Sequence, residues 1–260
     1  YKVGDWKLTG GDFYKEVGRG IALSLRKGDE VSADTSLLGS EVAYSNRSQA
    51  LSLFGGVTNQ ASLDPVERYT TEWKKDQVAG FTYELRSLGS FKVGTHGVFF
   101  QPEEPNGKPD DLYRSMVGGV TLEGIEVTEW MSFYSEVNVQ SLSRDKTIGN
   151  IVSSTKFQNY AGYATADFTF GDTLILTEAL ILGGEQTEGV GDGGGWELFG
   201  SPNTGSSYSD SSYSPFDYAR PPTLQRLQDE VADKMNVMGS RVRVEHYIED
   251  YDLTLYVNGL

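Results

Sequence analysis

The chain of 260 residues contains no cysteine. A disulfide framework, a thiolate nucleophile and a cysteine-ligated metal site are therefore excluded. Basic residues are also few, because 22 Lys and Arg stand against 37 Asp and Glu, which gives a net charge of −15. Nucleic-acid binding and a polybasic membrane anchor both need clustered positive charge, so we expect neither.

Long hydrophobic runs are missing as well. In an apolar stretch such as 174–182, Thr177 and Glu178 interrupt the run, which falls well short of the ~18 apolar residues that a spanning helix needs. Residues 1–10 lack the charged and apolar regions of a secretory signal. We expect no helical membrane span.

Motifs that carry chemistry are scarce. His96 and His246 lie in separate predicted strands without metal-ligand spacing, and neither a nucleophile elbow nor a phosphate-binding loop occurs. The glycine-rich run 189–195 has too few oxygen ligands for calcium unless Glu185, Glu188 or distant acids join it. The sequence therefore predicts no enzyme activity, no cofactor and no metal site.

What the chain does contain is 31 glycines, 15 tyrosines and repeated period-2 alternation, which predict an all-β fold. About twelve strands are expected, at roughly 2–9, 17–26, 40–47, 48–57, 78–86, 91–100, 113–122, 125–141, 157–170, 174–186, 240–248 and 253–259.

The connections between these strands alternate between short and long. The short ones are expected at 10–11, 46–47, 87–90, 123–124, 171–173 and 249–252, and the long ones at 27–39, 58–77, 101–112, 142–156 and 187–239. This sorting is typical of an antiparallel up-and-down transmembrane β-barrel with short inner turns and long outer loops. A soluble antiparallel protein with an apolar inner face remains the alternative.

Within the predicted barrel, one face of the hairpins is apolar and the other polar. The residues expected to line a pore on the polar face are Glu126, Trp130, Tyr134, Glu136, Tyr163 and Asp167. Their carboxylates would concentrate cations. The aromatic side chains either stack on sugar rings or fill a narrow barrel.

Glu129 and Glu178 are exceptions, because the expected turns place both on the apolar face. A carboxylate facing lipid is destabilising. Either a local bulge shifts the phase, or the two residues mark a stripe that another protein covers.

The connection 187–239 is predicted to be a long external loop, acidic and rich in Gly, Ser and Tyr over most of its length. A short helix is expected at about 223–235, where Leu224, Leu227, Val231 and Met235 recur at helical spacing.

The start of the chain carries a motif made of Gly11, Asp12, Phe13 and Tyr14, followed by Gly18, Arg19 and Gly20. It resembles the Gly-Asp-Phe-Tyr…Gly-Arg-Gly pattern of an uncharacterised family of Gram-negative outer-membrane β-barrels. The resemblance implies the bacterial outer membrane and no particular activity. Asp12 and Arg19 either form an inward ion pair or belong to a surface turn.

Together these features predict one β-barrel domain over residues 1–260, incomplete at both ends and part of a larger barrel. The expected function is a porin-like pore for small solutes or cations, or the barrel component of an envelope complex. Its partners would be outer-membrane lipid and other envelope proteins. A secreted soluble β-rich binding module is the alternative.

Overall fold

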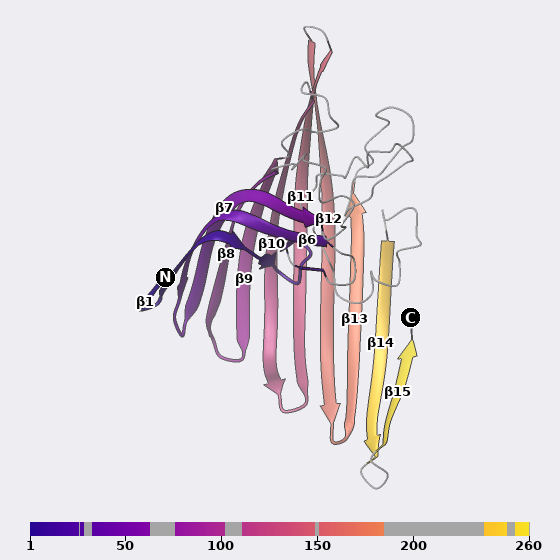
Figure 1. Cartoon of the computed structure of the whole chain (residues 1–260). Coiled ribbons are helices and arrows are strands. Elements are labelled where there is room, and N and C mark those ends of the chain that lie inside the picture. Colours follow the sequence, from indigo (N-terminus) through magenta and orange to yellow (C-terminus); the bar gives the residue numbers. More distant parts are fainter. Residues whose placement is uncertain are drawn as a thin grey trace.

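The computed structural model describes residues 1–25, 27–28, 33–62, 76–101, 111–148, 151–184, 237–248 and 253–259. Most of these residues form one large curved sheet (Figure 1). Its strands are β1 (Lys2–Val3), β2 (Trp6–Phe13), β5 (Lys27–Gly28), β6 (Ala33–Ser45), β7 (Gln49–Ser62), β8 (Gln77–Leu88), β9 (Phe91–Gln101), β10 (Asp111–Thr128), β11 (Met131–Ile148), β12 (Ile151–Phe170), β13 (Thr173–Gly184), β14 (Val237–Ile248) and β15 (Leu253–Gly259).

The sheet is 13-stranded and antiparallel, with the order β1-β2-β6-β7-β8-β9-β10-β11-β12-β13-β14-β15 and with β5 beside β6. The prediction of an all-β antiparallel meander is confirmed. The sheet is not closed, since β1 and β15 lie at its two ends. Barrel closure therefore stays a prediction.

A second, two-stranded sheet consists of β3 (Lys15–Val17) and β4 (Leu23–Leu25). It follows β2 directly, where the sequence predicts a single strand over 17–26. That prediction is wrong, because Gly18 and Gly20 have φ angles of 64° and 78°, which extended strands do not adopt.

Short turns join β8 to β9, β10 to β11 and β12 to β13 along one rim of the sheet, at the bottom of Figure 1. The antiparallel order puts the β1–β2 and β6–β7 turns on the same rim, which we call the short-turn rim. At the opposite side β10, β11 and β12 extend beyond their neighbours (Figure 1). The predicted long connection 142–156 is wrong, because Ile148 pairs with Ile151 and both strands continue through it.

Three predicted turns are misplaced. Gly10 and Gly11 lie inside β2, opposite Ser40 and Gly39. The β10–β11 turn falls at 129–130 rather than 123–124, because Thr128 pairs with Met131 after a register shift. The β12–β13 turn has two residues rather than three, because Phe170 pairs with Thr173.

In the part of the chain that the structure describes, no helix is long and apolar enough to cross a membrane. The predicted helix at 223–235, and the loop 187–239 up to residue 236, lie outside the described residues.

Candidate functional site

The two faces of the large sheet differ, because the inner face mixes buried polar and apolar side chains whereas the outer face exposes apolar ones. On β11, Tyr134, Glu136, Asn138 and Gln140 are buried, whereas Val137 is 54% exposed. Other exposed apolar side chains on this outer face include Leu8, Leu53, Phe81, Val93, Met116, Val120, Val139, Ile181, Val242 and Val257. The outer face is therefore apolar, and the inner face carries buried polar groups.

Residues 14–25, which we call the enclosed segment, lie against this inner face. Val17, Ile21, Leu23 and Leu25 are each at most 1% exposed. They belong to one apolar cluster with Leu37, Phe54 and Val78 from the large sheet. The enclosed segment thus covers part of the inner face and packs against its apolar side chains.

Glu136 is the first anchor of the enclosed segment. Its side chain is 1% exposed and accepts hydrogen bonds from the Arg19 backbone N–H at 2.8 Å, the Tyr134 hydroxyl at 2.6 Å and the Asn138 amide at 2.8 Å. A buried carboxylate is tolerated only when such donors compensate for its lost hydration.

Glycine is required at position 18. Its φ angle is +64°, and an added Cβ would lie 2.1 Å from Glu136 Oε1. A side chain would therefore be strained by the backbone and would also displace the carboxylate. The backbone of the enclosed segment at Gly18 is therefore packed directly against the Glu136 side chain of β11.

Lys15 is the second anchor. Its Nζ donates to Glu41 Oε1 at 2.6 Å and to Ser52 Oγ at 2.8 Å, and lies 4.9 Å from the centre of the Phe54 ring. Glu41 and Ser52 belong to β6 and β7, whereas Glu136 belongs to β11. One short segment thus contacts strands that are far apart in the sheet order, so the sheet curves around it.

The side chain of Arg19 is not buried within the enclosed segment. It is exposed, and its guanidinium lies 4.5 Å from the centre of the Tyr134 ring. Tyr163 packs beside Tyr134 with ring centres 6.3 Å apart, and its hydroxyl donates to Glu178 Oε1 at 3.1 Å.

Glu178 lies on the inner face, so its predicted position on the apolar face is wrong. The two-residue β12–β13 turn pairs Tyr163 with Leu180 and Thr165 with Glu178, which inverts the faces expected for β13. Arg241 Nη1 is 3.8 Å from Glu178 Oε2. Leu176 and Leu180 face inward with it, which the sequence did not anticipate.

Glu129 and Trp130 form the β10–β11 turn itself and are both exposed. Trp130 stacks on Phe168 and Phe170, with ring centres 6.2 and 5.5 Å apart. The side chain of Glu126 lies outside the described residues.

The motif at the start of the chain divides between β2 and the enclosed segment. Gly11, Asp12 and Phe13 end β2, and Phe13 packs against the apolar cluster. Ser36 donates a hydrogen bond to Asp12 at 3.2 Å. Tyr14 is exposed and Gly20 is buried.

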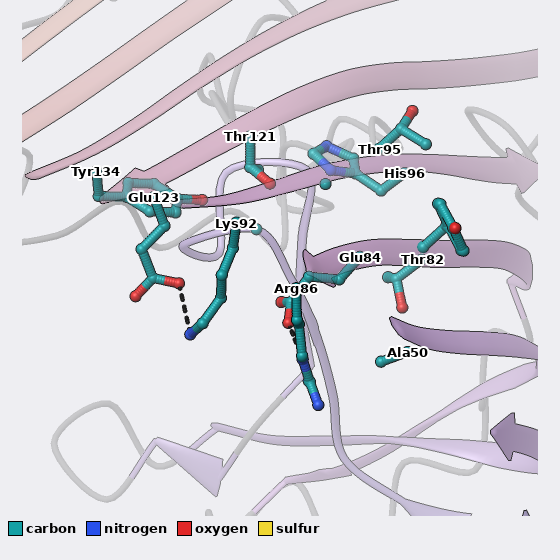
Figure 2. Close-up of a pocket in the computed structure, with 13 residues that line it drawn as sticks. Ala50, Thr82, Glu84, Arg86, Lys92, Thr95, His96, Thr121, Glu123 and Tyr134 are labelled. Atoms are coloured by element: carbon teal, nitrogen blue, oxygen red, sulfur yellow. Dashed lines mark hydrogen bonds and ion pairs between the residues drawn. The ribbon is translucent and has the colours of Figure 1, made fainter. Parts of the chain in front are cut away.

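A cavity of about 280 Å³ lies between the enclosed segment and the short-turn rim (Figure 2). Gly18, His96 and Tyr134 contribute to its inner end. Nearer the rim, Lys92 bonds Glu123 at 3.1 Å and Arg86 pairs with Glu84. The cavity is therefore lined by balanced pairs of charges.

Sequence reasoning missed Lys15, Glu41 and the buried position of His96. His96 Nε2 lies 2.6 Å from Asn138 Oδ1 and 3.8 Å from Glu136 Oε1. The one sequence feature that could have indicated these contacts was the closely spaced pair Gly18 and Gly20. Such a pair indicates a close approach of the backbone but does not identify the residue that it approaches.

No protein-family model matches the chain, and no curated protein matches it.

Proposed function

We propose that the chain is an outer-membrane β-barrel protein that acts as a porin-like pore, with the enclosed segment filling part of its lumen. The observation that carries the proposal is the change of character along the outer face of β12. Ser154, Lys156 and Gln158 are exposed and polar, and from Tyr160 onward this face is apolar.

The length of the apolar part matches a bilayer. Tyr160 and Phe170 are both exposed, and the outward positions between them are Gly162, Ala164, Ala166 and Phe168. At ~3.4 Å per residue this stretch runs ~34 Å along the strand, or ~25 Å along the normal of a barrel whose strands tilt by ~40°. Outer-membrane barrels carry an apolar band of about this height.

Aromatic side chains gather near the short-turn rim. Trp130 with Phe168 and Phe170, Phe91 with Phe133, and Trp6 with Tyr44 are paired rings close to these turns. Aromatic girdles flank the lipid-facing band of membrane barrels, because such rings favour the headgroup level. Cross-strand ring pairs also stabilise sheets in water, but only a bilayer gives a reason to gather them at one rim.

A barrel that serves an envelope complex, and a secreted β-rich binding module, are the competing functions. Heat-modifiable gel mobility after refolding into detergent is expected for the barrel, with ion conductance in planar bilayers for the pore. A heat-modifiable protein without conductance would favour the envelope complex. Solubility without detergent and unchanged mobility after boiling would refute the membrane proposal.

A further inference from the structure

We propose that the cavity beside the short-turn rim binds a free α-amino acid, and that the ion pair between Lys92 and Glu123 recognises its ammonium and carboxylate groups. The inference goes beyond the proposed pore, because it concerns equilibrium binding and requires no passage through the protein. It is carried by the arrangement of charges in the cavity, by the size of the cavity and by the polar groups at its inner end.

The charges of the cavity lie on three neighbouring strands close to the short-turn rim. Lys92 on β9 is directly opposite Glu123 on β10, and Lys92 Nζ lies 3.1 Å from Glu123 Oε2. Arg86 and Glu84, both on β8, form a second pair. Each of the four side chains is 31% or 35% exposed, and both pairs point to the same side of the strands (Figure 2). They are therefore accessible to a solute in the cavity.

A solute with a single charge gains little from such an ion pair. A cation that is attracted by Glu123 is repelled by Lys92 at nearly the same distance, and the converse holds for an anion. A solute that carries both charges can lie antiparallel to the pair, so that its ammonium faces Glu123 and its carboxylate faces Lys92. Balanced pairs therefore favour a zwitterion over a simple ion.

The spacing of the pair selects the kind of zwitterion. In an α-amino acid one carbon joins the ammonium to the carboxylate, and standard bond lengths put the nitrogen ~3 Å from the nearer carboxylate oxygen. This separation matches the 3.1 Å between Lys92 Nζ and Glu123 Oε2. A longer, flexible zwitterion must give up rotational freedom to meet both partners. The pair is therefore best matched by an α-amino acid.

The rest of the cavity suits the side chain of a small polar amino acid. At ~30 Å³ for each molecule of liquid water, 280 Å³ is the space of about nine waters, which is below the usual range for drug-sized ligands. The Thr121 hydroxyl lies over Gly94, since a Cβ added to this glycine would be 2.3 Å from Thr121 Oγ1. Thr82 and His96 are opposite each other and also line the cavity. Such groups favour a ligand side chain that forms hydrogen bonds, and L-glutamine is a suitable probe.

Equilibrium dialysis of radiolabelled L-glutamine against the protein refolded in detergent tests this assignment, and saturable binding is expected. N-acetyl-L-glutamine keeps the carboxylate without the ammonium, and L-glutamine amide keeps the ammonium without the carboxylate. A unit charge at ~4 Å in water changes an equilibrium constant about five-fold, so each blocked compound should compete at least about five-fold less well. Absence of saturable binding, or equal competition by all of these compounds, would overturn the inference.

Substitutions of the paired residues test which charge each part of the ligand meets. Glu123→Gln should weaken the binding of L-glutamine at least about five-fold and strengthen that of N-acetyl-L-glutamine, because Lys92 is then free to attract an anion. Lys92→Gln should weaken L-glutamine likewise and strengthen L-glutamine amide. Lys156→Gln and Glu129→Gln are the controls, because both side chains are exposed and neither lines the cavity. An ion pair with only a structural role would not exchange these preferences, so unchanged preferences would overturn the inference.

Binding and conductance can fail separately. A protein that conducts ions in planar bilayers but does not bind L-glutamine would refute this inference and leave the pore proposal in place. Saturable binding by a protein that inserts without conducting would support the amino-acid site and refute the pore.

Discussion

Placing arginine at Ala164 separates a lipid-facing sheet from one that faces water. Ala164 is exposed on the outer face of β12, four residues from Tyr160 and six from Phe170, which puts it near the middle of the apolar band. Ser154 is exposed on the same face of the same strand, six residues beyond Tyr160. Ser154→Arg is therefore a matched control outside the band.

The expected cost follows from depth in the bilayer. An arginine that faces lipid at the midplane destabilises a barrel by ~2–4 kcal/mol, and near the interface by ~0–1 kcal/mol. Since ~1.4 kcal/mol is a tenfold change in an equilibrium constant, Ala164→Arg should lower the folding constant by about 30- to 700-fold. Ser154→Arg should leave it within about five-fold.

Equilibrium folding from urea into phospholipid vesicles, followed by tryptophan fluorescence, measures both variants against the parent. Surface substitutions in water change stability by only about 0.5 kcal/mol. Equal folding constants for Ala164→Arg and Ser154→Arg would therefore refute the placement of β12 in a membrane.

Two further predictions concern the enclosed segment and the short-turn rim. Gly18→Ala should lower the free energy of unfolding, measured in denaturant, by ~1–3 kcal/mol more than Gly89→Ala does. The φ angle is positive at both positions, but only at Gly18 does an added Cβ meet Glu136. Equal losses of stability would contradict the close packing. Trp130 is stacked on Phe168. Its fluorescence should be quenched more by lipids brominated near the headgroups than by lipids brominated at the acyl-chain ends. Trp130→Phe gives the background signal of the other tryptophans. The reverse order would exclude an interfacial position.

The strands could be predicted from the sequence because alternation is a property of each strand alone. On β11, Tyr134 and Glu136 were expected on the same face, and both are buried on the inner face. The turns were harder, because Glu123-Gly124 has the composition of a turn yet continues as a strand. The predicted and the observed turn differ in position by an even number of residues. The side chains of β11 therefore remain on the faces that were predicted for them.

The inward position of Glu178 was not predictable in the same way. One residue more or less in the turn at Gly171 inverts every side chain of β13, and Gly-Asp-Thr permits either length. The strands beyond Gln140 were mistaken for a loop because both of their faces are polar there. Alternation disappears where both faces of a strand are polar, so periodicity carries no signal in such a segment.

The contact between Arg19 and Glu136 joins residues that are 117 positions apart. A meander can form hairpin by hairpin from contacts between neighbours, and such local steps are fast. The enclosed segment, however, cannot reach its carboxylate until β6 through β11 are in place. Ile21 and Leu23 remain without their native packing during that time, when exposed apolar groups favour aggregation. Assembly of this sheet therefore has a late, slow step, in which a segment that precedes β6 in the chain docks only after β11 has formed.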